Sequence, residues 1–549
     1  MKKIYLIISI ILLILETAVG QTADLVMSDG IVSPVHSVNI GKIAFTGKGK
    51  NIQNIKPSDF LTEVELQDKK DLNIQVFLGN SLTNYLHILA PELSAQELTK
   101  NGNYQFTFFV DDHVTYVENL HVGAGNLDSK NQKTTFRVPL ISTTNEDSWG
   151  RFLWNRFLMH GGEEAFTSGK HLLKIEIRPY IKLDSVLIGN KIAEGELNIR
   201  VPKIKINEKL VKIQAIKHLQ DWQISTNSID TAQIEELNKK IITQVYKDIT
   251  SIVVIKNGEL LIEEYFNGAN RHSLHDMRSV GKSFASTMMG VAIQEGYLKS
   301  EMQLLNEFYN LKSFKNYVQE KEQISLKDLL TMSSSFDGND MDAESPGNEE
   351  NMYPTENWVN FALDLPIDQH KAKTKKWDYF TAGVVILGDV IHQSVPNGLE
   401  KYADSHLFQP LGITHYKWQL TPQKVANTAG GIQLRSLDFA KYGQLYKNQG
   451  IWKGKQVIAQ EWIDKSLSRQ IAISENEYYG YLFWNKRYRV DDKNYEVYYS
   501  SGNGGNKVFI FKDQPLVIVI SSTAYNKPYG HTQVDKMMQD YLIPAIYKR

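Results

Sequence analysis

The segment Arg278-Ser279-Val280-Gly281-Lys282-Ser283-Phe284 decides how the second half of the chain is interpreted. An apolar run follows it to about Glu295 and predicts a buried helix that begins here. Ser279 and Lys282 are three residues apart, so a helix places both side chains on one face. A serine becomes a good nucleophile when a neighbouring base removes its proton, and a neutral lysine can be that base. Burial at the positive end of a helix favours the neutral form of a lysine.

The S-x-x-K pattern alone is weak evidence for catalysis. Ser325-Leu326-Lys327-Asp328 misses it by one position, which shows how easily it arises by chance. A helix N-cap followed by a surface lysine also explains the bare motif. The catalytic interpretation therefore depends on further motifs downstream and on their order.

Length, charge and cysteine content exclude several classes of protein. At 549 residues the chain is long enough for two or more domains. Its formal net charge of −1, with both signs interspersed, predicts no nucleic-acid partner. The absence of cysteine excludes disulfides, thiolate metal sites and a cysteine nucleophile. We predict no metal site, because His272 and His275 have no evident third ligand. We also predict no cofactor.

Residues 1–20 are predicted to be a cleaved signal peptide. Two lysines precede a short apolar run at 4–15, and small residues at 18–20 suit a cleavage site. We expect a periplasmic or secreted protein, with an uncleaved membrane anchor as the alternative. No other run reaches transmembrane length, so no stable membrane insertion is expected after signal removal.

Residues 21–206 are predicted to form an all-β sandwich with an accessory role. Leu173, Ile175 and Ile177 alternate with charged residues, as in a half-buried strand. Short strands at regular spacing, separated by turn residues, are typical of a sandwich. One helical piece is predicted at 149–159, and the ligand of this domain is unknown. The predicted strands are 73–78, 104–110, 134–140, 171–177 and 196–201.

Residues 207–549 are predicted to form an α+β domain. Asn257-Gly258 is a strong hairpin signal between strands at 252–255 and 260–266. Strands follow the helices again near the C-terminus, which predicts an antiparallel sheet where the two ends of the domain meet. The other predicted elements are an amphipathic helix at 229–245, strands at 508–511 and 517–521, and a last helix at 534–546.

Several motifs in order resemble the serine β-lactamase and penicillin-binding-protein superfamily, most closely its class C-like branch. The Ser279–Lys282 segment is similar to the nucleophile motif, residues 325–334 to a later helix, and residues 430–443 to a long signature. The resemblance covers about residues 245–549 and does not extend into the N-terminal half. It implies an α+β domain with an antiparallel sheet, flanking helices and an inserted helical lobe.

The resemblance implies a base role for Tyr379. This tyrosine stands at the family's second motif, where Thr381 replaces the usual amide side chain. Tyr379 would share the base role with Lys282, either as a phenolate or as a neutral pair that passes one proton. A buried aromatic residue at the end of a loop is the structural alternative.

The resemblance also implies an oxyanion strand. Asn503-Gly504-Gly505 is expected to align with the family's Lys-Thr-Gly or His-Thr-Gly triplet, and the amides of Ser279 and Asn506 would hold the oxyanion. An asparagine here lacks the charge that binds a substrate carboxylate. Lys507 is a candidate to compensate for the missing charge, although strand alternation predicts that its side chain points differently from that of Asn506. A plain glycine-rich turn is the alternative.

Together these features predict an exported serine hydrolase that forms an acyl-enzyme with an ester or amide substrate, either a small molecule or a peptide. The long polar stretch at 333–376 is expected to be a loop over the site. One alternative is a D-alanyl-D-alanine carboxypeptidase or β-lactamase. Others are a non-catalytic cell-wall-binding protein and a sensor that is acylated without turnover. The sequence does not name the substrate.

Overall fold

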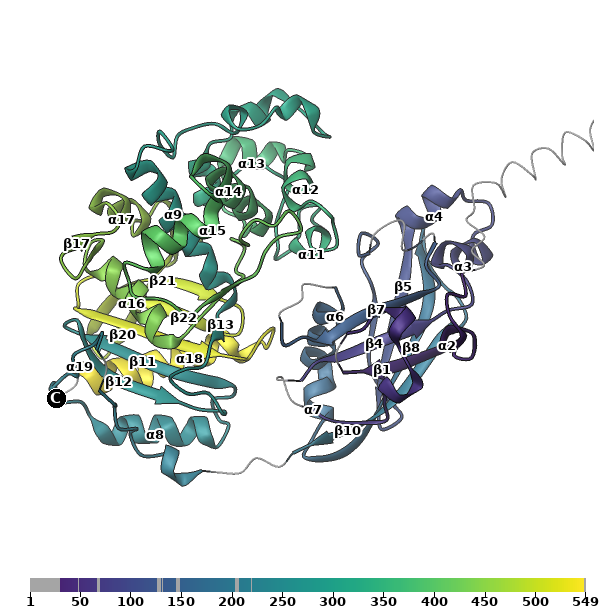
Figure 1. Cartoon of the computed structure of the whole chain (residues 1–549), viewed down its shortest axis with the longest axis horizontal. Coiled ribbons are helices and arrows are strands. Elements are labelled where there is room, and N and C mark those ends of the chain that lie inside the picture. Colours follow the sequence, from purple (N-terminus) through teal and green to yellow (C-terminus); the bar gives the residue numbers. More distant parts are fainter. Residues whose placement is uncertain are drawn as a thin grey trace, which may run out of the picture. The chain divides into compact units, whose positions relative to one another are not determined.

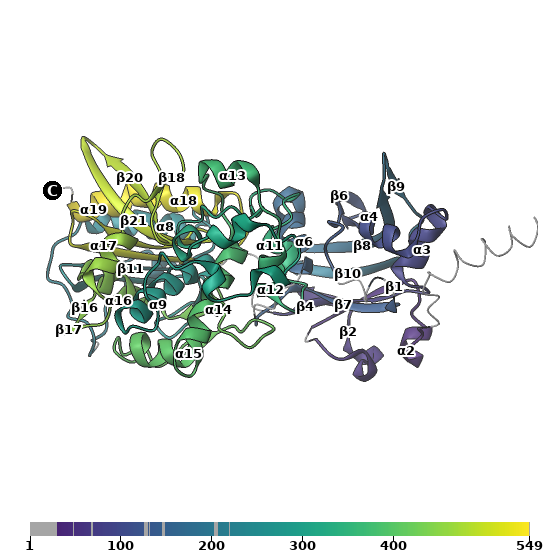
Figure 2. The same ribbon diagram turned by 90° about the horizontal axis from the view of Figure 1, so that it is seen from above.

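The computed structural model describes residues 30–47, 49–66, 70–125, 130, 132–144, 149–202, 207–218 and 220–547. The predicted signal peptide lies outside these residues. The chain divides into two compact units, Met1–Ile204 and Lys205–Arg549 (Figures 1 and 2). No helix in the described part of the chain is long and apolar enough to cross a membrane.

The N-terminal unit contains the predicted strands, but they belong to one hydrogen-bonded sheet rather than to two stacked sheets. The strands are β1 (Lys42–Thr46), β2 (Phe60–Leu61), β3 (Glu63–Glu65), β4 (Leu72–Phe77), β5 (Gly102–Val110), β6 (His113–Asn119), β7 (Thr135–Ile141), β8 (Gly169–Lys182), β9 (Val186–Ile188) and β10 (Ala193–Val201). The main path through the described strands is β6-β5-β8-β10-β1-β4-β7. The pairing of β1 with β10 is parallel and joins the two ends of the unit.

Helices make the N-terminal unit a mixed structure, which corrects the all-β prediction. The helix α6 (Trp149–Phe157) was predicted, whereas α3 (Leu82–Leu89) and α4 (Ala95–Asn101) were not. Serine side chains cap both missed helices, and their leucines lie in the core of the unit. Each helix is short and begins with a polar cap residue, so its local sequence resembles a turn.

The C-terminal unit is built on an antiparallel sheet, as predicted. Its strands are β11 (Ile249–Lys256), β12 (Glu259–Tyr265), β18 (Ile471–Ala472), β19 (Tyr478–Tyr479), β20 (Trp484–Val490), β21 (Lys493–Gly502), β22 (Asn506–Phe511) and β23 (Leu516–Ser522). Their order is β12-β11-β23-β22-β21-β20-β19-β18, so the first hairpin of the unit pairs with its last strand. Asn257 and Gly258 have φ values of +54° and +79°, as the predicted tight turn requires.

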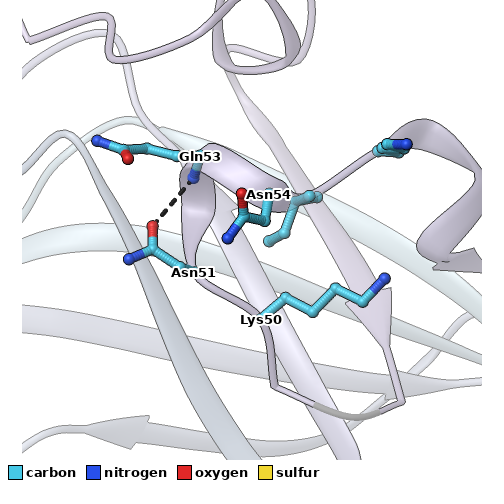
Figure 3. A pocket seen from close by; sticks show the side chains of 6 residues that line it. Lys50, Asn51, Gln53 and Asn54 are labelled. Carbon is cyan, nitrogen blue, oxygen red and sulfur yellow. Dashed lines mark hydrogen bonds between the residues drawn. The ribbon is translucent and has the colours of Figure 1, made fainter.

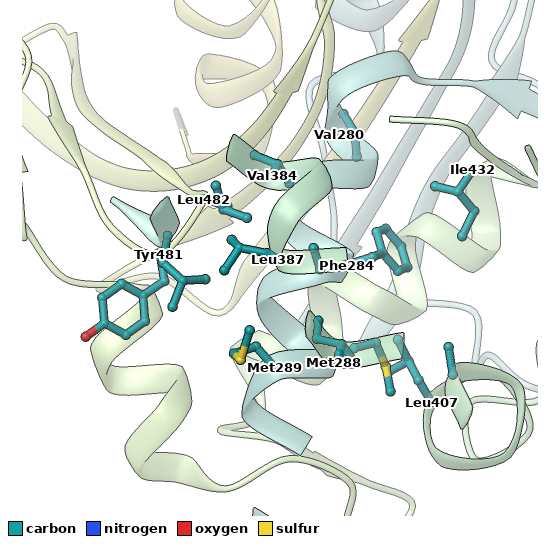
Figure 4. Close-up of a cluster of buried hydrophobic side chains, with 14 of the residues drawn as sticks. Val280, Phe284, Met288, Met289, Val384, Leu387, Leu407, Ile432, Tyr481 and Leu482 are labelled. Atoms are coloured by element: carbon teal, nitrogen blue, oxygen red, sulfur yellow. The ribbon is translucent and has the colours of Figure 1, made fainter. Parts of the chain in front are cut away.

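Helices pack on both faces of this sheet (Figure 1). The helices α8 (Thr231–Ile242), α18 (Tyr529–Met537) and α19 (Ile543–Tyr547) share one core with the sheet. On the other face, α9 (Lys282–Gln294) and α16 (Ser436–Lys447) belong to the larger core. Figure 4 shows Phe284, Met288 and Met289 of α9 within this core. Burial of this apolar helix fixes the segment that precedes it.

A helical lobe is inserted between α9 and α16. It contains α10 (Leu326–Leu330), α11 (Glu349–Met352), α12 (Trp358–Asp364), α13 (Gln369–Thr374), α14 (Thr381–Ser394) and α15 (Gly398–Ala403). The stretch 333–376 therefore holds three short helices, which corrects the expectation of an unstructured loop. Asn348, Asn357 and Asp368 cap these helices. Asparagine and aspartate favour both turns and helix N-caps, so composition alone does not separate the two.

Candidate active site

Ser279 lies in a single 3₁₀ turn, Arg278–Gly281, directly before α9. Arg278 has a φ of +53°, an uncommon conformation for a residue with a side chain, and its N–H donates to Asp276 Oδ1 at 3.0 Å. The turn packs tightly on another backbone segment, since a Cβ on Gly281 would lie 2.9 Å from Gly430 Cα. Ser279 itself remains partly exposed and can meet a substrate.

Lys282 lies beside the serine hydroxyl, as the three-residue spacing predicts. Its Nζ donates to Ser279 Oγ at 2.9 Å and to the carbonyl of Ala429 at 2.5 Å. Only 2% of the lysine is exposed. Within the described part of the chain it forms no salt bridge, so its contacts are a hydroxyl, a carbonyl and a ring. Sequence analysis missed Ala429, which precedes the conspicuous Gly430-Gly431 pair by one residue.

Tyr379 completes the cluster from the helical lobe. Lys282 Nζ lies 5.2 Å from the centre of the tyrosine ring. Burial raises the pKa of Tyr379, while the positive charge of Lys282 and a hydrogen bond from Ser279 lower it, and the net shift is upward. The tyrosine is therefore a neutral phenol near pH 7, which favours the neutral-pair form of the base over the phenolate.

An aromatic wall continues from Tyr379 along the site. The Tyr379 and Trp484 rings stack with centroids 6.0 Å apart, and Trp377 lies 6.3 Å from Tyr379 and 5.3 Å from Trp484. Both tryptophans are partly exposed. This wall holds the tyrosine in position and offers apolar surface to a substrate.

The strand beside the nucleophile is β21, and its last residue, Gly502, packs against the nucleophile turn. A Cβ on Gly502 would lie 1.9 Å from Met277 O and 3.1 Å from Ser279 N, so only glycine allows this approach. Ser500 lies on the same side of the strand and donates to Ser283 Oγ at 2.8 Å. The two β21 residues that face the start of α9 are thus uncharged.

The predicted oxyanion triplet Asn503-Gly504-Gly505 forms the turn between β21 and β22, as the alternative of a glycine-rich turn predicts. A Cβ on Gly505 would lie 2.1 Å from Gly530 O, so this glycine packs against the start of α18. Asn506 is the ladder partner of Gly502, and its buried side chain binds Asn503 O and Ser522 O. The side-chain oxygen of Asn503 accepts from the N–H of Asn526 at 2.6 Å. The side chains of Asn503 and Asn506 thus hold this hairpin turn together.

Lys507 is directed away from the serine, and Thr381 is buried in the helical lobe. Lys507 is buried on the opposite face of the sheet, with Nζ 3.0 Å from Asp535 Oδ1. Strand alternation therefore predicted its direction correctly. Thr381 is fully buried at the first turn of α14, and its N–H donates to Asp340 Oδ2 at 2.7 Å.

Arg278 is the cation next to Ser279 in the chain, and it has other contacts. Its guanidinium carbon lies 4.2 Å from the centre of the Tyr525 ring, and Nη1 lies 3.6 Å from Asp276 Oδ2. The Tyr525 hydroxyl donates to the carbonyl of Asp276 at 2.7 Å, which fixes this ring. These contacts order the turn that carries the serine.

A pocket on the N-terminal unit has no part in this chemistry (Figure 3). Its lining offers amide and ammonium groups from one short stretch of chain, without a nucleophile and base pair. The lining residues are Lys50, Asn51, Gln53, Asn54, Ile55 and Lys56.

A family model described as Beta-lactamase matches residues 244–537, more than half of the chain. The chain therefore belongs to the Beta-lactamase family, a family of serine hydrolases. The match coincides with the unit that holds Ser279, Lys282 and Tyr379, and it leaves the N-terminal unit unassigned.

Solved structures of low sequence identity resemble the chain. A protein from Bacillus anthracis, provisionally named a 6-aminohexanoate-dimer hydrolase, is 17% identical, with a TM-score of 0.46 over 61% of this chain and 88% of its own. An octameric penicillin-binding protein homologue from Pyrococcus abyssi is 17% identical, with a TM-score of 0.43 over 58% and 79%. A class C β-lactamase is 16% identical, with a TM-score of 0.43 over 58% and 97%. The family assignment rests on the family model.

Proposed function

We propose that the chain is an exported serine hydrolase that cleaves an ester or amide through an acyl-enzyme. The observation that carries the proposal is the 2.9 Å contact between Lys282 Nζ and Ser279 Oγ, with the centre of the Tyr379 ring 5.2 Å from the same Nζ. Export is inferred from the sequence of residues 1–20 alone.

In the proposed reaction, the Ser279 proton passes to the Lys282 amine, directly or through Tyr379, as Oγ attacks the substrate carbonyl carbon. The bond from that carbon to the leaving oxygen or nitrogen then breaks, and the leaving group takes up the proton. A water molecule attacks the acyl-enzyme in the same way and regenerates the serine. No cofactor enters these steps.

We place the oxyanion between the amides of Ser279 and Asn503. Asn503 follows Gly502, whose backbone packs against the nucleophile turn: a Cβ on Gly502 would lie 3.1 Å from Ser279 N. Each such donor typically contributes about 3–4 kcal/mol of transition-state stabilisation. This assignment replaces the amide of Asn506, whose residue is paired within the hairpin ladder.

The site supports a substrate without a carboxylate beside the scissile bond. Ser500 and Gly502 are the β21 residues next to the nucleophile turn, and neither carries a charge. Lys507 is held by Asp535 on the other face. These features favour an esterase or amidase over a penicillin-recognising enzyme.

An activity-based fluorophosphonate, followed by a substrate screen, tests the proposal. We expect labelling of the purified full chain, loss of labelling in Ser279→Ala, and turnover of short-chain p-nitrophenyl esters. Hydrolysis of a chromogenic cephalosporin or of D-amino-acid peptides with higher kcat/KM would instead assign a β-lactamase or carboxypeptidase. A burst of one equivalent without further turnover would identify a sensor, and no reaction with any probe would identify a non-catalytic protein.

A further inference from the structure

The aromatic wall formed by Trp377, Tyr379 and Trp484 is accessible beside the nucleophile. All three residues are partly exposed, as is Ser279. The proposed proton transfer uses only the hydroxyl of Tyr379, so the two tryptophans have no part in it. Aromatic side chains that remain exposed next to a reactive group are typical of a surface that binds a ligand.

Trp484 is held in one orientation by the sheet. It is the first residue of β20, and its ladder partners are Tyr479 of β19 and Tyr499 of β21. These tyrosines are only 1% and 3% exposed, and their ring centroids lie 5.3 Å and 6.3 Å from that of Trp484. A ring that is fixed before binding loses little conformational entropy when a ligand packs against it.

Trp377 is fixed through the residue that follows it. Asp378 N donates to the carbonyl of Met332 at 3.1 Å, and the Asp378 carboxylate lies 3.0 Å from Lys371 Nζ. The ring of Trp377 meets that of Trp484 edge-on, at 5.3 Å and an interplanar angle of 69°. Two rings at this angle allow a third ring to stack on one and to meet the other edge-on.

The position of Tyr379 within the wall assigns the wall to one side of the scissile bond. In the proposed reaction, the leaving oxygen or nitrogen takes up the proton that Ser279 has given to Lys282, directly or through Tyr379. The leaving group therefore approaches the Tyr379 hydroxyl, and a substituent that it carries comes next to the wall. The acyl carbon, by contrast, is bonded to Ser279 Oγ.

The neighbouring lysine favours a neutral occupant of the wall. Aromatic surfaces also bind quaternary ammonium groups. Lys282 Nζ, however, lies 5.2 Å from the centre of the Tyr379 ring, and Lys282 takes up a proton in the proposed reaction. A cation on the same wall would oppose that protonation, whereas a neutral ring would not.

We propose that Trp377 and Trp484 bind a neutral aromatic ring carried by the leaving group. The favoured substrates are then esters or amides of arylalkyl alcohols or amines. The inference rests on the proposed function and names the substrate class of the same site. The two tryptophans determine specificity and take no part in making or breaking bonds.

Isomeric esters test the proposal on the full chain. The aromatic ring belongs to the alcohol in 2-phenylethyl butyrate and to the acyl group in its isomer ethyl 4-phenylbutyrate, and ethyl butyrate has no ring. We expect kcat/KM for 2-phenylethyl butyrate to be at least about tenfold higher than for the other two esters. Equal values for the two isomers, or a higher value for ethyl 4-phenylbutyrate, would overturn the proposal. A higher value for butyrylcholine would overturn it in favour of a cation site.

Trp484→Leu should remove most of the preference for 2-phenylethyl butyrate over ethyl butyrate, mainly through a higher KM for the former. Because Trp484 also stacks on Tyr379, hydrolysis of both esters is expected to fall, so the ratio of their kcat/KM values is the readout. The control is Trp452→Leu, which removes a tryptophan that packs edge-on against Trp222 at 5.8 Å, and it should keep the ratio. An unchanged ratio in Trp484→Leu would contradict the assignment.

A measurement on the unaltered protein does not depend on the folding of a variant. The alcohol 2-phenylethanol should inhibit the hydrolysis of ethyl butyrate competitively, and n-butanol at the same concentration should inhibit it much less. Equal inhibition by the two alcohols would overturn the role of the wall. A protein that fluorophosphonate labels and that hydrolyses all these esters with equal kcat/KM would overturn this inference alone. Absence of both labelling and ester turnover would overturn the proposed hydrolase function itself.

Discussion

The C-terminal unit holds two buried lysines, one associated with each face of its sheet. Lys282 lies at the start of α9 and contacts Ser279 Oγ and the Ala429 carbonyl. Lys507 lies on β22, on the face covered by α18, and contacts Asp535. Both are 2% exposed. Their burial is the same, and only their partners differ.

Each lysine also lies near a tyrosine ring, so the aromatic neighbour does not separate them. Lys282 Nζ is 5.2 Å from the centre of the Tyr379 ring, and Lys507 Nζ is 4.9 Å from that of Tyr499. Trp484 links the two tyrosines, with ring centroids 6.0 Å from Tyr379 and 6.3 Å from Tyr499. The two lysines therefore stand at opposite ends of one aromatic row.

The two lysines differ in whether a carboxylate forms an ion pair with them. Burial raises the pKa of Asp535, but the charges of Lys507 and Lys486 outweigh it and hold that pKa at about 2. Burial lowers the pKa of Lys507 to about 8, despite Asp535. Such an ion pair fixes structure. Among the described residues, no carboxylate forms an ion pair with Lys282, so its amine is available to the serine.

Exchange of each lysine for methionine tests this comparison most strongly. We expect Lys282→Met to lower kcat/KM for p-nitrophenyl esters by about 10³-fold or more, because the serine loses its base. Lys507→Met should leave kcat/KM within a few-fold of wild type. Similar losses in both variants, at temperatures where both are folded by circular dichroism, would contradict the different roles.

Tyr379→Phe is expected to lower kcat by about 10²-fold with a small change in KM, because the ring remains and only the proton relay is lost. The raised pKa of Tyr379 keeps the phenol protonated below about pH 10, so the wild-type rate should show no rise from phenolate formation between pH 7 and 9. A pH–rate profile of both proteins checks this. A tyrosine-dependent rise in that range would support the phenolate form instead.

Gly502→Ala tests which part of the hairpin faces the nucleophile. The added Cβ would meet Met277 O and Ser279 N, so we expect a loss in kcat/KM of about tenfold or more as the turn shifts. Asn503→Ala keeps the backbone amide, so we expect a smaller loss in kcat/KM for this variant. Steady-state kinetics of the two variants give the order. A larger loss in Asn503→Ala would favour a role of that side chain at the site.

Asp535→Asn should affect stability more than activity. The pKa of Asp535 in the folded state, about 2, is below the ordinary value, so the carboxylate stabilises the fold above about pH 4 and this contribution is lost as pH falls toward 2. Asp535 is about one-third exposed, so we expect a loss of only about 1–2 kcal/mol at pH 7. Urea unfolding at pH 7 and pH 3 measures the free energy of unfolding of both proteins. The difference in this free energy between variant and wild type should be smaller at pH 3, and an equal difference at both pH values would contradict the ion-pair explanation.

Local features of the site were accessible from the sequence. The Ser279–Lys282 contact spans one helical turn, so spacing alone predicts it. Tyr379 required a resemblance, because the lobe that carries it is separated from Ser279 by about one hundred residues. The glycine-rich run after Ser501 is ambiguous, because its local sequence does not show which glycine ends the strand and which forms the turn.

Features that depend on contacts between segments far apart in the sequence could not be predicted from the sequence. Alternation predicted the N-terminal strands, but the parallel pairing of Lys42 with Glu194 that closes them into one sheet has no local signal. Asp340 lies in a polar stretch whose composition suggests a loop, and only the fold brings it to the carbonyl of Tyr379.

The most direct test of the catalytic cluster is mass spectrometry of the full chain after reaction with a fluorophosphonate. We predict one added phosphonyl group, located on the peptide that contains Ser279, and slower labelling in Lys282→Met but not in Lys507→Met. Labelling on another residue, or equal labelling rates in both lysine variants, would contradict the assignment of Ser279 and Lys282.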